Sequence, residues 1–400
     1  MTIISVLLTT SALLIGIPVC VLFVEIVAST VLPQPGRRSV DAARPRVAVL
    51  VPAHNESIHL VPTLEDINAQ LGPADRLLVV VDNCSDDTAI VAARSKAEVV
   101  IRLDPTKIGK GYALDFGLRH LAADPPDVVV MIDADCRISP TAIEQLSYAA
   151  AASYRPVQAL NLMTTPCRAS HSCNVAEFAW RIKNWVRPLG LGALHLPCHL
   201  TGTGMAFPWE VIRRADLASG SIVEDLKLGV DLAIAGYPPL FYPLVKVASA
   251  FPLSALARTR QRTRWEQGHF SMIRQAVPRL ISSGILRGDV RLVCLAFDLA
   301  VPPLSLLGIL TAATFVLSSF GAFIGICIAP FVVSLACLVG LVAATFICWI
   351  TQGRDILPLR SLWALPAYAI NKVPMYATLF ANGKITQWTR TERNPDSSKA

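Results

Sequence analysis

Charged residues are scarce in this sequence. Of its 400 residues, 16% are Asp, Glu, Lys or Arg, whereas 53% are hydrophobic and the mean hydropathy is +0.50. This composition excludes a wholly soluble protein and predicts membrane-spanning segments. The few charges are biased toward Lys and Arg, with a formal net charge of +7. Such a balance suits an anionic lipid surface or a phosphorylated substrate.

Two familiar motifs are also missing. The 10 Cys residues are scattered and include no C-x-x-C pair. We therefore interpret them as reduced, partly buried thiols and not as a metal cluster or a disulfide framework. Residues 107–114 place glycines beside a helix start, but the Walker spacing of a phosphate loop is absent. Lys110 at such a start can still meet a phosphate or a neighbouring carboxylate.

A long apolar run stands at the beginning of the chain. Residues 3–32 are almost continuously apolar, long enough to cross a bilayer core of about 30 Å. No basic segment precedes the run and no small-residue cleavage site follows it, so we predict an anchor at 1–34 and not a signal peptide. Arginines follow the run, and the positive-inside rule places the next domain in the cytosol. We expect Glu25, inside the run, to face a protein neighbour.

Further apolar runs close the chain. Residues 292–317 and 322–350 predict two more spans, within a C-terminal transmembrane and interfacial region at 291–382. The weaker run 361–381 spans, re-enters or lies at the interface. A basic tail at 383–400 that lies in the cytosol requires an odd number of spans, which favours the last two options. We expect an integral protein of a bacterial inner (plasma) membrane.

The middle of the chain alternates short apolar runs with helical patterns. Apolar, β-branched runs lie at 47–51, 77–81, 99–102 and 128–132, with helical patterns between them. This rhythm predicts an α/β domain with a doubly wound, mostly parallel sheet at 45–250. Ligands of such sheets bind at the carboxyl ends of the strands.

Carboxylates stand where two of these runs end. Asp133 and Asp135 follow the run 128–132, and Asp82 follows the run 77–81. Two carboxylates at the end of a central strand can converge on one hard cation that bridges a diphosphate. A surface turn is the alternative interpretation, because aspartate is common in turns.

Two later segments combine glycines or acids with predicted structure. Residues 201–207 predict a strand whose glycines permit close approach of a ligand or another backbone. Glu224 and Asp225 begin a predicted helix, where the helix dipole favours acids whatever their function. A carboxylate at that position keeps a low pKa and stays ionised, as a general base must.

Aromatic and basic residues mix in two predicted helices. If 261–269 is helical, Gln261, Arg264 and Trp265 share one face, which suits a diphosphate and a sugar ring. A basic juxtamembrane helix is the alternative. The amphipathic segment 174–186 binds a sugar acceptor, lies on a membrane or simply packs as a helix.

Taken in order, these motifs resemble the membrane-bound family 2 glycosyltransferases, among which cellulose, chitin and hyaluronan synthases are best known. The resemblance covers roughly the cytosolic half of the chain and rests on residues 52–56, Asp82, 133–135, 224–225 and the Q-x-x-R-W motif at 261–265. It implies a GT-A fold, a nucleotide-sugar donor, inversion at the anomeric carbon, and interface helices at 251–290 that carry the last motif.

The resemblance also implies roles for individual residues. Asp225 is the expected general base, and Asp133 and Asp135 are the expected ligands of Mg²⁺ or Mn²⁺. The expected donor-binding residues are Pro52, His54, Glu56, Asp82, Lys110, Asp133, Gln261 and Arg264. The expected acceptor-binding residues are Thr203, Gly204, Glu224 and Trp265.

These roles predict a hexosyltransferase that moves a sugar from a nucleotide sugar to a growing polysaccharide or oligosaccharide of the cell surface. We expect the donor to be a UDP-sugar. Three expected spans are fewer than the channel-forming synthases have. Transfer of a single sugar to a glycolipid or polyprenyl-linked acceptor is therefore an alternative, as is an inactive scaffold in an export complex. The expected partners are the donor, a saccharide or lipid-linked acceptor, membrane lipids, and a second copy or an export protein. No nucleic-acid partner is expected.

Overall fold

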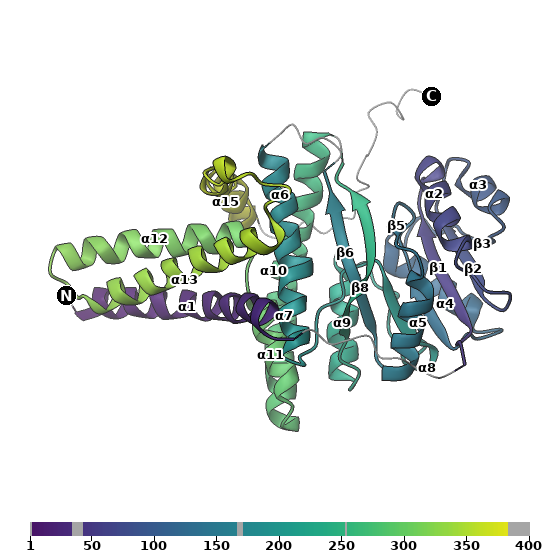
Figure 1. The fold of residues 1–400 in the computed structure, drawn as a ribbon, viewed down its shortest axis with the longest axis horizontal. Coiled ribbons are helices and arrows are strands. Elements are labelled where there is room, and N and C mark those ends of the chain that lie inside the picture. The colour runs from purple at the N-terminus through teal and green to yellow at the C-terminus, as the bar shows by residue number, and fades with distance from the viewer. Residues whose placement is uncertain (1, 34–42, 166–170, 253, 383–400) are drawn as a thin grey trace. The chain divides into compact units, whose positions relative to one another are not determined.

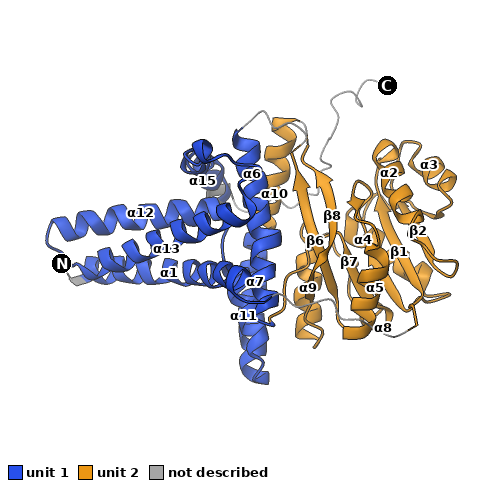
Figure 2. Cartoon of the chain, viewed as in Figure 1, with its two compact units in different colours: residues 1–34, 167–195, 269–385 blue, residues 35–166, 196–268, 386–400 orange. Residues whose placement is uncertain are grey.

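The computed structural model describes residues 2–33, 43–165, 171–252 and 254–382. Two compact units make up the chain, coloured separately in Figure 2. Unit 1 comprises residues 1–34, 167–195 and 269–385, and unit 2 comprises residues 35–166, 196–268 and 386–400. The basic tail predicted at 383–400 lies outside the described residues.

Unit 2 is built on one eight-stranded sheet in the order β3-β2-β1-β4-β7-β6-β8-β5 (Figure 1). The strands are β1 Val47–Ala53, β2 Arg76–Asp82, β3 Glu98–Arg102, β4 Val128–Met131, β5 Arg137–Ile138, β6 Val157–Thr164, β7 Met205–Pro208 and β8 Leu240–Ala250. β1 to β4 pair in parallel, as do β6 and β8, whereas β7 and β5 are antiparallel to their neighbours. The predicted α/β fold with a mostly parallel sheet is confirmed.

Helices cover both faces of this sheet. They are α2 Ser57–Asn68, α3 Thr88–Arg94, α4 Lys110–Leu121, α5 Ala142–Ser153, α8 Trp209–Ile212, α9 Glu224–Ile234 and the first part of α10 Ala255–Arg287. Val49 of β1 packs in one core with Leu60 of α2, and Leu50 packs in a second core with Leu114 of α4. Because neighbouring strand residues enter different cores, the central strands are apolar on both faces.

The segment 201–207 is a strand only at its end. β7 begins at Met205, and the two glycines before it have φ values of +90° (Gly202) and +67° (Gly204). The prediction of a strand from residue 201 was therefore wrong, because these backbone angles belong to a turn. A Cβ atom at Gly204 would lie 2.7 Å from Cγ2 of Val247, so the close approach that the glycine permits is to the protein's own sheet.

Unit 1 contains three described helices that are long and apolar enough to cross a membrane. They are residues 3–31 of α1 (Thr2–Val31), α12 (Leu304–Phe323) and α13 (Ala329–Gln352). This number agrees with the sequence prediction. Figure 2 shows α6 (His171–Arg181) and α11 (Val290–Ala300) running across the direction of these three helices.

One prediction for the C-terminal region needed correction, and for the run 361–381 the structure agrees with the options that the sequence favoured. The expected span at 292–317 is broken, because α11 ends at Ala300 and α12 begins only after Pro302 and Pro303. Proline has no N–H to donate and clashes with a preceding helical turn. The weaker run 361–381 forms two short helices, α14 (Ala364–Ile370) and α15 (Val373–Asn382), after the short 3-10 turn η2 (Leu359–Ser361). Each of these helices is too short to span a bilayer alone.

The amphipathic segment 174–186 packs inside unit 1. It forms most of α6 and the π-helix η1 (Ile182–Val186), which continues into α7 (Arg187–Ala193). Phe178 and Ile182 lie in one apolar core with Leu22 of α1 and Trp349 of α13. Of the interpretations open for this segment, the structure therefore supports helix packing.

A buried ion network joins three helices of unit 1. Nε of Arg187 donates to Oε2 of Glu25 over 2.6 Å, and Nη2 donates to the carbonyl oxygen of Asp298 over 2.9 Å and also pairs with its carboxylate. Glu25 is 2% exposed and Asp298 is 6% exposed. Glu25 thus faces a protein partner, as predicted for an acid within an apolar span.

Candidate active site

The loops after β1 and β2 lie together at the carboxyl edge of the sheet. Pro52 pairs with Val80 in the register of these parallel strands. Nδ1 of His54 donates to the carbonyl oxygen of Asp82 over 2.7 Å. Glu56, at the start of α2, donates its backbone N–H to the hydroxyl of Thr88 over 3.0 Å. The four donor-binding residues predicted from this region are thus neighbours.

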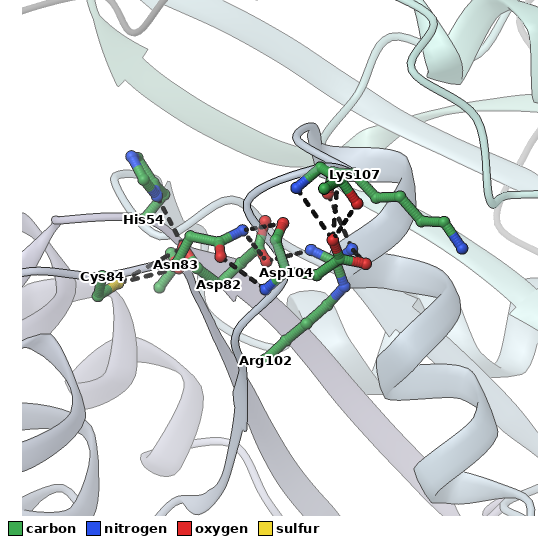
Figure 3. A network of polar contacts seen from close by, with 9 residues as sticks. His54, Asp82, Asn83, Cys84, Arg102, Asp104 and Lys107 are labelled. Carbon is green, nitrogen blue, oxygen red and sulfur yellow. Dashed lines mark hydrogen bonds and ion pairs between the residues drawn. The ribbon is translucent and has the colours of Figure 1, made fainter.

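Asp82 is buried and paired with an arginine. Asp82 is 6% exposed. Its Oδ1 accepts from Nη1 of Arg102 over 2.6 Å and from Nδ2 of Asn83 over 3.0 Å (Figure 3). Burial raises the pKa of Asp82 above its usual value, although Arg102 opposes this rise. Sequence reasoning missed Arg102. The available signal was a cation at the end of an apolar strand beside the strand that carries Asp82.

Lys110 lies at the centre of the acidic residues. It begins α4, and its Nζ donates to the carbonyl oxygen of Gly202 over 2.6 Å and pairs with Asp133. Burial disfavours the charged amine, but the carboxylates of Asp133, Glu224 and Asp225 outweigh burial and raise the pKa of Lys110 above its usual value. Lys110 is therefore a permanent cation within a cluster of acids.

Asp133 and Asp135 follow β4 in an arrangement that fits a metal. One ligand atom each from Asp133, Asp135 and Cys136 lie within 4.8 Å of one another. The carboxylate oxygens suit Mg²⁺ or Mn²⁺, which prefer oxygen ligands. Burial raises the pKa of the Cys136 thiol to about 12, so this thiol stays protonated and is a poor partner for a hard cation. The backbone N–H of Asp133 donates to Oγ1 of Thr203 over 3.0 Å.

Two of the predicted acceptor residues contact the loop after β4 and the end of that strand. Thr203 is 3% exposed, and its hydroxyl also donates to Sγ of Cys136 over 3.5 Å. Gly204 donates its N–H to the carbonyl oxygen of Met131 over 3.0 Å. These contacts fix the turn 201–204 against the end of β4.

Glu224 and Asp225 begin α9 on the other side of that turn. A Cβ atom on Gly202 would lie 3.1 Å from Oδ2 of Asp225, which places this carboxylate against the turn. Burial, followed by the charge of Asp225, raises the pKa of Glu224 to about 7. The expectation that an acid here keeps a low pKa is therefore wrong for Glu224, because burial and a neighbouring acid exceed the effect of the helix dipole.

The Q-x-x-R-W motif lies on α10, so its predicted helical conformation is confirmed. Gln261 is 5% exposed. A Cβ atom on Gly268 would lie 2.5 Å from Cγ1 of Val223, so α10 packs closely against the residue that precedes α9. Burial lowers the pKa of Arg264 from its usual value, and the charge of Glu224 opposes this change. Arg264 is thus near Glu224 of α9, on the helix that also carries Trp265.

Five of the predicted site residues therefore form one charged cluster. Lys110 lies near Asp133, Glu224 and Asp225. Arg264 interacts with Glu224. Four segments far apart in the sequence supply these residues: α4, the loop after β4, α9 and α10. Two cations among several carboxylates could hold a diphosphate, a divalent cation and an ionised base at once.

Comparison with known proteins assigns this chain to a family. Residues 45–268, more than half of the chain, match the family model described as Glycosyltransferase like family 2. The chain is 27% identical over 243 residues to "Probable glycosyltransferase YdaM" of Bacillus subtilis, which covers 56% of this chain and 55% of that protein. It is 38% identical over 95 residues to glucosyl-3-phosphoglycerate synthase of Mycobacterium tuberculosis, covering 22% of this chain and 28% of that protein. The chain thus spans about half the length of the first relative and less of the second.

A solved structure supports the fold over nearly the whole chain. The mannosyltransferase PcManGT from Pyrobaculum calidifontis, solved in complex with GDP-Man and Mn²⁺, matches with a TM-score of 0.56. The match covers 94% of this chain and 100% of that chain at 18% identity, so it shows the fold alone. Together with the family model, it confirms the GT-A fold, and the chain belongs to the family described as Glycosyltransferase like family 2.

Proposed function

We propose that this glycosyltransferase is membrane-bound and inverting, and that it moves a hexose from a nucleotide sugar to a saccharide acceptor. The observation that carries the proposal is the gathering of Lys110 with Asp133, Glu224 and Asp225 at the carboxyl edge of the sheet. Sheets of this class bind their ligands at that edge.

The donor side consists of the loops after β1 and β2 together with the two cations. Pro52, His54, Glu56 and Asp82 bind the nucleoside, for which we propose uridine. Lys110, Gln261 and Arg264 bind the diphosphate by charge-assisted hydrogen bonds. Asp133 and Asp135 hold Mg²⁺ or Mn²⁺, and a cation held there would neutralise part of the charge on the leaving diphosphate.

The transfer step needs one base. Asp225 takes the proton from the acceptor hydroxyl as the oxygen attacks the anomeric carbon and the bond to the diphosphate breaks. The Lys110 ammonium is close enough to Asp225 for this carboxylate to raise the pKa of the amine. A single displacement inverts the anomeric centre, so an α-linked donor gives a β-linked product. Glu224, Thr203, Gly204 and Trp265 then belong to the acceptor side.

The number of membrane spans bears on which acceptor the protein uses. We propose that 1–34 and 291–382 hold the catalytic domain, 45–250, and its interface helices, 251–290, at the cytosolic face of a bacterial inner membrane. The described residues include three helices that could span it. The favoured acceptor is a growing polysaccharide of the cell surface. A lipid-linked acceptor is the second candidate, because three spans offer less than a synthase needs for its own export channel.

An inactive scaffold is the least favoured function. A protein that only scaffolds an export complex would not need a lysine, Lys110, clustered with several carboxylates. Here the Lys110 amine pairs with Asp133 and also donates to the carbonyl oxygen of Gly202. The cluster therefore favours an active enzyme.

The test uses the full chain in detergent with Mg²⁺ or Mn²⁺ and a panel of UDP-glucose, UDP-galactose, UDP-N-acetylglucosamine and GDP-mannose. Nucleotide release and product size are followed together, with and without extracted membrane lipids. Release from one donor with a long product supports a polymer synthase and names its sugar. Release with a single-sugar lipid product supports the lipid acceptor. No release from any donor, with lipids present, contradicts the proposed activity.

A further inference from the structure

A buried arginine that no motif includes holds together the region proposed to bind the nucleotide. The Arg102 side chain is 8% exposed, and its guanidinium contacts four neighbours, of which Figure 3 labels Asp82, Asp104 and Lys107. Nη1 donates to Oδ1 of Asp82 over 2.6 Å, and Nη2 donates to the carbonyl oxygen of Lys107 over 2.8 Å and lies 3.3 Å from Oδ2 of Asp104. Its carbon Cζ lies 5.5 Å from the centre of the Tyr112 ring.

These neighbours belong to two separate parts of the site. Asp82 ends β2 and lies beside the loop after β1, where His54 donates to its carbonyl oxygen. Asp104 and Lys107 belong to the connection 103–109, which leads from β3 to Lys110. A second bridge runs beside the arginine. Asn83 accepts from the backbone N–H of Asp104 over 2.8 Å and donates to its carbonyl oxygen over 3.2 Å.

The connection 103–109 also holds its own shape. Oδ1 of Asp104 accepts from the backbone N–H groups of Thr106, over 3.0 Å, and Lys107, over 3.1 Å. This local turn presents the Lys107 carbonyl oxygen to Arg102. Because the turn is bonded to Arg102 and Arg102 to Asp82, the guanidinium connects the segment that leads into α4 with the end of β2, in addition to the bridge through Asn83.

The chemistry requires an arginine for this purpose. A carboxylate as buried as Asp82 is costly to keep ionised without a partner, so losing Arg102 would favour its protonation or its movement toward water. A planar guanidinium can meet a carboxylate and a carbonyl oxygen in fixed directions at the same time. An ammonium on a flexible stem keeps the charge but not this geometry.

We propose that Arg102 is a positioning residue for the nucleotide part of the donor. It holds Asp82, which we propose to bind the nucleoside, in a fixed position relative to the segment that leads to Lys110, which we propose to bind the diphosphate. The inference rests on the proposed function, since it assigns Arg102 to the same site. A preorganised site lowers the ordering cost of binding. The effect of Arg102 therefore falls on nucleotide affinity and on donor KM, and the proton transfer to Asp225 is left nearly unchanged.

Arg76 provides a matched control for a purely structural ion pair. It begins β2, the strand that Asp82 ends, and its Nη2 and Nε donate to Oε2 of Glu98 over 2.9 and 3.1 Å. Its side chain is 21% exposed. Arg76 thus joins the same two strands, β2 and β3, at the edge away from the site. Its removal should weaken the fold without reaching the nucleotide.

The test is calorimetric titration of UDP, in the presence of Mn²⁺, into the full chain and its variants in detergent. We expect Arg102→Met to bind UDP about tenfold or more weakly, the scale of one lost hydrogen bond to a charged group. Arg102→Lys should be intermediate. Arg76→Met should lower the melting temperature and keep the wild-type affinity for UDP. With the sugar donor that the wild type uses, Arg102→Met should raise KM and change kcat by less than about threefold.

A double-mutant cycle tests whether Arg102 acts through Asp82. In an Asp82→Asn background, Arg102→Met should cost less UDP affinity than in the wild type, because the shared interaction is already lost. If Arg102→Met does not fold, Arg102→Lys and Arg102→Gln give the same comparison. Wild-type UDP affinity in the folded Arg102 variants overturns the inference and leaves the proposed function intact. The same follows if Arg76→Met loses as much UDP affinity as Arg102→Met. A wild-type chain that binds neither UDP nor GDP overturns the proposed function and the inference with it.

Discussion

A single methyl group at Gly202 should impair catalysis by displacing Asp225. Gly202 has a φ of +90°, and its carbonyl oxygen accepts from Nζ of Lys110 over 2.6 Å. A Cβ atom added there would lie 3.1 Å from Oδ2 of Asp225 and 3.7 Å from Nζ of Lys110. Gly202→Ala therefore introduces a contact with the proposed base and one with the cation beside it.

Two effects of Gly202→Ala can be separated in magnitude. An L-residue with left-handed backbone angles costs about 1–2 kcal/mol, which lowers the melting temperature by about 2–8 °C for a unit of this size. The 3.1 Å contact is tighter than ordinary packing, so the carboxylate must move by a few tenths of an ångström. Since misplacement by about 1 Å can cost about a hundredfold in rate, we expect kcat to fall about threefold to tenfold.

Gly236 is the control that isolates the second effect. Its φ is +99°, and a Cβ atom there would meet nothing within 4 Å. Gly236→Ala should lower the melting temperature by a similar amount and leave kcat unchanged. The assay compares thermal unfolding and nucleotide release for both variants in detergent. Equal kcat values for Gly202→Ala and Gly236→Ala would refute the placement of Asp225 as the base.

Three further predictions concern the metal, pH and unit 1. Asp133→Asn should raise the Mn²⁺ concentration needed for half-maximal nucleotide release, because one anionic ligand is lost; an unchanged requirement would exclude Asp133 as a ligand. The pKa of Glu224 is raised from 4.5 to about 7 in the folded chain, so its stabilising contribution is complete below pH 4.5 and is lost as the pH rises through 7. Glu224→Gln should therefore gain in melting temperature relative to wild type between pH 5 and pH 8, and a constant difference would contradict the shift. Arg187→Met should destabilise unit 1 by about 3–5 kcal/mol, since it leaves Glu25 and Asp298 buried without their cation; an unchanged melting temperature in detergent would contradict this.

Much of the fold could be predicted because its signals are local. The central strands are buried on both faces, so runs such as 77–81 and 128–132 are continuously apolar and easy to recognise. Carboxylates at their ends mark the ligand edge in the sequence itself. The same holds for α10, where the spacing of the Q-x-x-R-W motif already indicates a helical face.

The features that escaped prediction depend on contacts between distant segments. Arg102 lies 20 positions after Asp82, and its role arises only when β3 pairs beside β2. The raised pKa of Glu224 requires burial and Asp225 together, which the helix dipole alone does not reveal. The turn at Gly202 resembles a strand in sequence because glycine is compatible with both. The break before α12 was visible as Pro302 and Pro303, but the apolar content around them masked it.

The most direct test of the account compares the wild-type chain with Asp225→Asn. Both proteins are purified in detergent with Mn²⁺ and given the nucleotide sugar that the wild type accepts, and nucleotide release and nucleotide affinity are measured on the same samples. We expect Asp225→Asn to bind the nucleotide as tightly as wild type and to release almost none from the donor, because only the base is lost. Release at the wild-type rate by Asp225→Asn would contradict it.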